Sequence, residues 1–350
     1  MNIIDESNIN KIYLMMGFNC NFHCRYCHQT PIKNENLFSK SISQEIYDYI
    51  YKLIEIKKDE KLKIIFWGGE PLLYWNIIQK FVLHYEDKLE YAIISNGSLV
   101  NQEKVDFINK YNISFSLSHD GPNTIKTRRI DVLQIPTIFY YLNQINKLSF
   151  NAVLSGYNYD FNKLFDYWEQ FSPDTFGNIE MLRISWDMPE DLTDINLDEY
   201  RSGLKTFFQS AIDKIKKEIF SIKALSAVKY IKRIKKSIEN QKYHFPLCGQ
   251  VEYNMNIDLD GNIYACHNCS VKVGDISEDR EIYLQRYYEW LETKKKPVCE
   301  TCEAKYFCQG GCPLDIDNSV CILQKILYEE TKNSYENNKE IWDSVKINVV

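Results

Sequence analysis

Short apolar segments alternate with amphipathic segments through the first half of the chain. The apolar segments are rich in β-forming residues and predict strands at 11–18, 62–69, 91–97, 113–118, 150–156 and 181–187. Between them lie stretches with helical periodicity, such as SQEIYDYIYKLIEIKKD and NQEKVDFINKY. Repeated strand–helix units favour parallel strands joined by helical crossovers. Six strands are too few to close an eight-stranded barrel, so we predict the α/β class with a partial (β/α)6 TIM barrel.

The rest of the chain has a different pattern. Residues 195–242 have helical periodicity, and their basic stretch KALSAVKYIKRIKKSIENQK predicts a solvated helix face, with a groove for an acidic peptide as the alternative. From Cys248 onward, Gly and Cys replace long apolar periodicity, so we expect a loop-rich region that bound metal must hold together. A final helix is expected at about 322–345. The predicted divisions are a barrel (1–195), a helical bridge (196–245), a cysteine-rich domain (246–325) and a C-terminal helix (326–350).

Unusual polar stretches follow several predicted strands. They are CNFHCRYC at 20–27, GGEP at 68–71, SNGS at 95–98 and SHDG at 118–121. Ligands gather at the carboxyl ends of the strands in parallel α/β folds. We therefore expect these four stretches to meet at one edge of the barrel.

Composition excludes several classes of protein. The formal net charge of −6 over 350 residues argues against a general nucleic-acid binder. The first ten residues, MNIIDESNIN, lack the apolar region of a signal peptide, and no run of 18 apolar residues predicts a membrane span. These features predict a cytoplasmic enzyme without a membrane or nucleic-acid partner.

The 11 cysteines are unusual for a protein of a reducing compartment, where structural disulfides are rare. Three lie near the N-terminus, and eight lie between Cys248 and Cys321. This segregation favours metal ligation over scattered core positions.

Cys20, Cys24 and Cys27 have the spacing C-x3-C-x2-C. A structural zinc site needs four ligands, usually in two pairs, and no fourth cysteine follows nearby. A 4Fe–4S cluster held by three thiolates would keep one iron open for a further ligand, and an open metal position permits chemistry.

This spacing after a first strand resembles the radical S-adenosylmethionine (SAM) superfamily. The resemblance extends to the aromatic residue before the third cysteine. It includes GGEP, a stretch that holds the methionine amino group in that family. It also includes the ends of later strands, where related enzymes have residues that contact the ribose and the carboxylate of SAM. It implies that SAM is bound by Tyr26, Gly68, Gly69, Glu70, Pro71, Ser95, Asn96, Ser118, Asp120 and Arg128. Glu70 is expected to face the ammonium group, with the glycines letting backbone approach the ligand. The implied mechanism is cleavage of SAM to a 5′-deoxyadenosyl radical that abstracts a substrate hydrogen.

The C-terminal cysteines resemble the SPASM extension of radical SAM enzymes, so that 246–325 would be a SPASM domain. Zinc ribbons are the alternative, but the x5 and x3 spacings after Cys302 and Cys308 do not suit them. The resemblance implies two auxiliary 4Fe–4S clusters and three clusters in all. The outer cluster would use Cys299, Cys302, Cys308 and Cys321; the inner one would use Cys248, Cys266 and Cys312. Either Cys269 is the fourth inner ligand, which we favour, or the inner cluster has an open iron.

SPASM proteins mostly act on peptides, frequently ribosomal precursor peptides. Since auxiliary clusters accept electrons, the resemblance implies an oxidative modification such as a C–C, C–O or C–S crosslink. The alternatives are formylglycine formation as in anaerobic sulfatase maturases, a small-molecule radical oxidation, and a pure electron-transfer protein. In the sulfatase branch an Asp follows the G-x4-C cysteine, whereas here His267 does. His267 and Asp120 are the candidate proton-transfer residues, and His267 could instead only support the neighbouring cluster ligand.

The expected partners are a precursor peptide and a flavodoxin or ferredoxin reductant. Because only 19 residues precede Cys20, we expect leader recognition to come from a separate protein, from the barrel or from the bridge helices.

Overall fold

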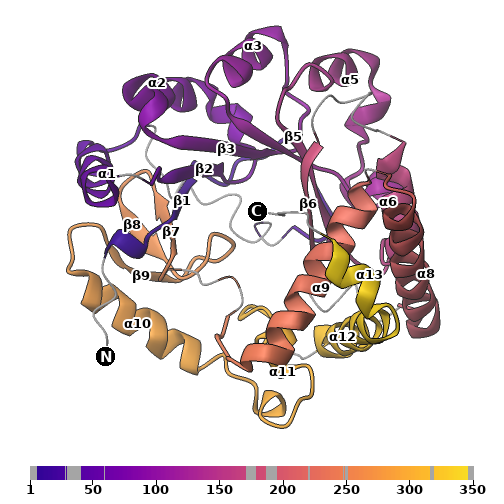
Figure 1. Ribbon diagram of the computed structural model, residues 1–350. Coiled ribbons are helices and arrows are strands. Elements are labelled where there is room, and N and C mark those ends of the chain that lie inside the picture. Colours follow the sequence, from indigo (N-terminus) through magenta and orange to yellow (C-terminus); the bar gives the residue numbers. More distant parts are fainter. Residues whose placement is uncertain are drawn as a thin grey trace.

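The computed structural model describes residues 6–27, 29, 41–58, 60–170, 179–186 (backbone only), 195–219, 221–246, 248, 251–315 and 319–345. A curved sheet forms the body of the molecule, with helices along its outer side (Figure 1). Its strand order is β6-β5-β4-β3-β2-β1-β7-β8-β9.

The six parallel strands predicted from the sequence are confirmed, as is the α/β class. They are β1 (Lys11–Met15), β2 (Lys63–Trp67), β3 (Glu90–Ser95), β4 (Ser114–Ser118), β5 (Leu148–Leu154) and β6 (Ile179–Trp186). Each pairs with the next in parallel, from β1–β2 to β5–β6. Among the described strands, β6 and β9 are the two edges of the sheet, which is therefore open there, as expected of a partial barrel.

Helices connect and cover the strands. Those of the barrel half are α1 (Gln44–Lys57), α2 (Trp75–Tyr85), α3 (Gln102–Lys110), α4 (Thr124–Arg128), α5 (Pro136–Leu142) and α6 (Phe161–Glu169). The later ones are α8 (Leu197–Lys216), α9 (Ile222–Asn240), α10 (Arg280–Glu292), α11 (Lys305–Cys308), α12 (Ser319–Asn337) and α13 (Lys339–Ser344). The helical region predicted at 195–242 is thus α8 and α9, and the predicted last helix is α12 and α13.

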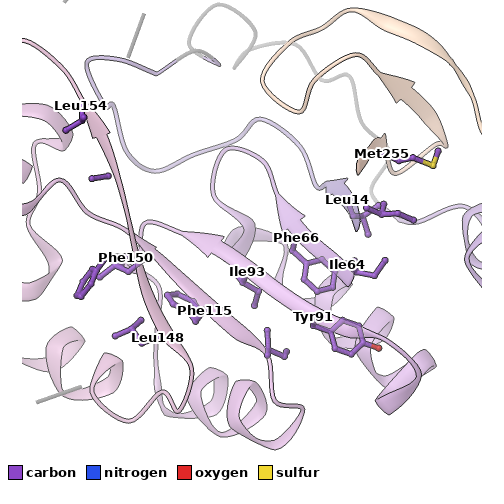
Figure 2. Packing of buried hydrophobic residues seen from close by; sticks show 14 of the residues in the cluster. Leu14, Ile64, Phe66, Tyr91, Ile93, Phe115, Leu148, Phe150, Leu154 and Met255 are labelled. Atoms are coloured by element: carbon purple, nitrogen blue, oxygen red, sulfur yellow. The ribbon is translucent and has the colours of Figure 1, made fainter. Parts of the chain in front are cut away.

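Alternation along the strands produces two faces of different character. One face buries a large apolar cluster against the helices, and Figure 2 shows Leu14, Phe66, Phe115 and Phe150 among its members. The opposite, inner face carries a smaller cluster of Tyr13, Ile65 and Ala92, with Trp67 and Ile94 packed against it. Because side chains alternate along a strand, residues that follow a core residue at a strand end point towards the inside of the curve.

The expectation of a loop-rich region after Cys248 was partly wrong. β7 (Asn254–Asp258) pairs with β1 in parallel over five residues, and β8 (Asn262–Tyr264) and β9 (Lys272–Asp275) continue the sheet in antiparallel fashion. Met255, Ile257 and Ile263 belong to the main apolar cluster. Asn254 and Asn256 interrupt the apolar pattern of β7, so the pattern of hydrophobic residues did not predict this strand. This region therefore has an apolar core that it shares with the barrel.

The basic stretch on α9 is also not a uniformly solvated face. Lys223 is only 1% exposed, and its Nζ donates to Asn162 Oδ1 (2.8 Å) and pairs with Asp166. Arg233 donates from Nε to the Phe307 carbonyl oxygen (2.6 Å) and lies 4.2 Å from the centre of that ring. Long-range partners thus bury Lys223 and partly bury Arg233, two cations that the sequence pattern placed in water. Among the described residues, none of the helices has the length and apolar content to cross a bilayer.

Candidate active site

The loop that carries the first three cysteines, residues 16–27, is here called the cluster loop. It continues the β1–β2 pairing beyond the ends of both strands. The added hydrogen bonds run from Met16 N to Trp67 O (2.8 Å), from Gly69 N to Gly17 O (2.8 Å) and from Glu70 N to Asn19 O (2.9 Å). GGEP thereby fixes the backbone that leads into Cys20.

Gly68 and Gly69 are required by this close approach. A Cβ on Gly68 would lie 2.4 Å from the Gly17 carbonyl oxygen, and one on Gly69 would lie 2.3 Å from the Asn19 oxygen. Gly68 also has a φ of +156°. The sequence reading assigned these glycines to backbone contact with a ligand; the contact that the structure shows is with the cluster loop.

Glu70 is fully buried and links two strand ends. Its carboxylate accepts hydrogen bonds from Leu72 N (2.9 Å), Ser95 Oγ (2.7 Å) and Asn96 N (2.8 Å). Burial raises the pKa of Glu70, and the three donors oppose that effect. Pro71, next in the chain, begins a 3-10 helix, Pro71–Tyr74. These contacts join the ends of β2 and β3, and the expected partnership of Glu70 with an ammonium group stays a prediction.

The SNG stretch meets the cluster loop directly. Asn96 Nδ2 donates to Asn21 Oδ1 (2.9 Å) and lies 4.0 Å from the Cys20 sulfur. Ser95 and Asn96 are both buried. The predicted meeting of these two strand-end motifs is therefore present.

Asp120 is the centre of a second network, also fully buried. It accepts hydrogen bonds from Tyr26 Oη (2.5 Å), Thr127 Oγ1 (2.7 Å), Arg128 Nη2 (3.2 Å) and Val153 N (2.9 Å). Arg128 Nε lies 2.9 Å from Oδ2 as well. Each oxygen of Asp120 is engaged by at least two donors, so its contacts favour holding the cluster loop over transferring protons.

The same network surrounds the second cysteine. The Arg128 guanidinium lies 5.3 Å from the centre of the Tyr26 ring. Burial raises the pKa of the Cys24 thiol to about 11, while the charge of Arg128 acts in the opposite direction. Burial likewise raises the pKa of Tyr26 well above its ordinary value. Ser118 follows the core residue Leu117 at the end of β4, so it faces the inside of the curve.

His119 and Asp131 form a buried pair that the sequence analysis did not single out. His119 Nδ1 accepts from Gly121 N (3.1 Å), so the ring proton is on Nε2 and is donated to Asp131 Oδ1 (2.8 Å). Burial acts to raise the pKa of Asp131, but the hydrogen bonds from His119, Leu133 N and Tyr167 bring it below its ordinary value. The pair fixes the loop after β4, which contains Asp120.

The eight C-terminal thiols fall into two groups. Cys299, Cys302, Cys308 and Cys321 line one pocket. Burial raises the pKa of Cys266, and the charges of Cys269, Cys312 and Cys248 raise it further. Within the described ranges, no three His, Cys, Asp or Glu side chains meet in the geometry of a single-ion site. The shared pocket associates the four thiols of the outer set, and the charge effects associate Cys269, Cys312 and Cys248 with Cys266. That either set ligates a cluster stays a prediction.

His267 lies over the inner face of β1 and β2. Its ring stacks on Tyr13, with centroids 4.3 Å apart and planes at 12°, and meets Trp67 edge-on at 4.8 Å. Trp67 Nε1 also donates to the His267 carbonyl oxygen (3.1 Å). The residue after Cys266 is thus held beside the barrel interior. Alternation in KIYLM and KIIFW could have placed Tyr13 and Trp67 on the inner face, but no local signal indicated a partner 200 residues away.

The cluster loop, the strand-end motifs and the parallel half-barrel define a class of protein. Residues 14–159 match the family model of the Radical SAM superfamily. The chain therefore carries a radical SAM domain, whose cofactors are SAM and an iron–sulfur cluster. Cys20, Cys24 and Cys27 provide soft thiolate donors at the carboxyl end of β1, which fits such a cluster.

Full-length comparisons extend the similarity beyond that domain. The chain is 25% identical to the radical SAM cyclopropyl synthase TigE of Paramaledivibacter caminithermalis, over 91% of this chain and 73% of that protein. It is 20% identical to a cysteine-type anaerobic sulfatase-maturating enzyme of Clostridium perfringens, over 84% of this chain and 85% of the relative.

Solved structures share the fold across the C-terminal region too. Native anSMEcpe with bound AdoMet superposes with a TM-score of 0.69 at 17% identity, over 96% of this chain and 99% of that one. SuiB of Streptococcus suis bound to the precursor peptide SuiA superposes with a TM-score of 0.59 at 16% identity, over 89% of this chain and 76% of the other.

Proposed function

We propose that this chain is a radical SAM enzyme that abstracts hydrogen from a ribosomally made peptide and leaves an oxidative modification. The observation that carries the proposal is the position of His267. Its stack on Tyr13 and its edge-on contact with Trp67 hold the neighbouring Cys266 beside the barrel interior that the cluster loop borders, which supports an inner cluster there. A substrate side chain inside the barrel would then lie between a site of hydrogen abstraction and a site that accepts electrons.

Three 4Fe–4S clusters are proposed, one in the cluster loop and two in the C-terminal thiol groups. The inner group is assigned Cys248, Cys266, Cys269 and Cys312, and the outer group Cys299, Cys302, Cys308 and Cys321. Bound SAM and its cluster supply a hydrogen-abstracting radical. The chain's own part is to hold the cluster loop through Glu70 and Asp120, to enclose SAM between the ends of β1–β4, and to exclude water.

The proposed substrate is a peptide and the proposed product contains a new carbon–carbon bond. SuiB was solved with a precursor peptide, which supports the first part. TigE is a cyclopropyl synthase, and closing a cyclopropane ring joins two carbons with loss of two hydrogens, which supports the second. Formylglycine formation is the alternative, supported by the similarity to sulfatase-maturating enzymes. A reducing cytoplasm suits a protein with so many free thiols.

Mass spectrometry of a peptide encoded beside the gene tests the proposal after anaerobic co-expression with the enzyme. A ring or crosslink removes the mass of two hydrogens, and no atom is added. The matched control replaces Cys20, Cys24 and Cys27 with Ala, which should leave the peptide unchanged. Formylglycine made from a serine also removes two hydrogens, so fragmentation of the peptide must locate the change. An aldehyde on a single residue would establish the alternative, and modification by the triple variant would contradict the proposed radical site.

A further inference from the structure

Helix α4 has two faces with different tasks. Thr124, Thr127 and Arg128 are buried, and the last two bond to Asp120. On the other side Ile125 is 55% exposed, and Lys126 is exposed beside it. The residues of the buried face support the expected SAM site through Asp120, whereas the residues of the exposed face have no role in that site.

That exposed face joins the cluster loop. Arg25 N donates to the Thr127 carbonyl oxygen (2.9 Å), and Arg129 Nε donates to the His23 carbonyl oxygen (3.0 Å). The Arg25 guanidinium lies 5.0 Å from the centre of the Tyr157 ring, and its Nη1 donates to Tyr157 Oη (3.1 Å). These contacts bring the exposed end of α4 beside the cluster loop. The exposed residues of the two segments and of Tyr157 are here called the rim patch: Arg25, Ile125, Lys126, Arg129, Ile130 and Tyr157.

The rim patch is positively charged on a chain whose net charge is −6. Its three cations are exposed, and none of its six members is a carboxylate. Two nearby carboxylates are buried and already paired, Asp120 with Arg128 and Asp131 with His119. Ile130 and Tyr157 are 40% and 41% exposed, so apolar area lies among the cations. Exposed cations around apolar side chains are the composition of a surface that steers and then binds an acidic protein.

We propose that the rim patch is the docking surface for a small acidic protein that donates one electron, of the flavodoxin or ferredoxin kind. The inference rests on the proposed function, because a radical SAM site must be reduced before it acts. Arg25 follows Cys24 directly in the chain. Arg129 donates a hydrogen bond to the carbonyl oxygen of His23, the residue before Cys24. A protein seated on the patch is therefore beside the cluster loop. The donor would lose one electron and a cluster held by Cys20, Cys24 and Cys27 would gain it, with no atom transferred.

Binding of a purified flavodoxin to the reconstituted enzyme tests this directly. Lys126→Glu reverses one patch charge and leaves the Arg25 and Arg129 contacts in place. Its dissociation constant for flavodoxin should rise about tenfold at low ionic strength, with the difference shrinking as salt is added. Lys236→Glu, an exposed position on α9, is the matched control and should bind like the unmodified protein. A variant with Arg25, Lys126 and Arg129 all changed to Gln should bind more weakly still.

A second readout separates this inference from the proposed function. SAM cleavage is measured with flavodoxin and, separately, with dithionite, which needs no docking surface. Lys126→Glu should be slow with flavodoxin and normal with dithionite. Unchanged flavodoxin affinity in both patch variants would overturn the docking proposal. So would a raised KM for the peptide with intact flavodoxin binding, which would make the patch a peptide site. Absence of cleavage by the unmodified enzyme with dithionite would instead overturn the proposed function.

Discussion

Asp120 connects three segments that are far apart in sequence. Tyr26 comes from the cluster loop, Arg128 from α4 and Val153 from β5, and all three bond to its carboxylate. A carboxylate with every lone-pair direction in use has little capacity to accept a substrate proton. The sequence could identify Asp120 as a site residue, but only its contacts separate positioning from catalysis.

Asp120→Asn should destabilise the protein by about 3–5 kcal/mol, because it leaves the buried Arg128 without its counter-charge. Urea unfolding of the cluster-free protein measures this, with the exposed Asp106→Asn on α3 as the control. If Asp120→Asn unfolds like the control but loses peptide modification, Asp120 is a catalytic residue after all.

Asp131 makes the free energy of unfolding depend on pH in the acidic range. Because its pKa is lowered in the folded protein, its contribution to stability is complete above pH ~5. That contribution is lost as the pH falls through the lowered value, which lies below 3.8. The free energy of unfolding should therefore fall more steeply below pH ~4 in the unmodified protein than in Asp131→Asn. Equal slopes, measured by denaturant unfolding at several pH values, would exclude this assignment.

At the scale of elements, β7 is the part of the fold that the sequence reading missed. NMNID carries asparagines at alternate positions, and β7 becomes recognisable only when β1 lies beside it. β1 to β6 were predictable because each has a local apolar run between turn residues. The burial of Lys223 and the partial burial of Arg233 were not predictable, because their partners lie on α6 and α11.

Met255→Ala tests whether the C-terminal region unfolds together with the barrel. Met255 is fully buried in β7, and Tyr49 Oη on α1 lies 3.4 Å from its sulfur. Truncation should cost about 2–5 kcal/mol and shift a single unfolding transition, whereas Val271→Ala, at a position 39% exposed, should cost much less. Two separate unfolding transitions, with only that of the C-terminal region shifted by Met255→Ala, would mean that this region folds independently of the barrel.

At the scale of the whole molecule, the proposed clusters use one group of three thiols and two groups of four. Anaerobically reconstituted protein should contain about twelve irons per chain, and the variant lacking Cys20, Cys24 and Cys27 about eight. Cys269→Ala should alter the spectroscopic signature of the inner cluster without changing that of the outer one. Iron content near four in the unmodified protein would contradict both auxiliary clusters, and an unaltered spectrum of Cys269→Ala would leave the inner cluster with an open iron.

β1 is only five residues long, yet it lies between β2 and β7 and leads directly into the cluster loop. Its register with both neighbours fixes where the first cysteine and the His267 stack stand relative to each other. A one-residue insertion in this strand would turn Tyr13 to the outer face and displace Cys20 from Asn96 in the same step. β1 therefore has almost no freedom to change length, because one added residue would alter two sites at once.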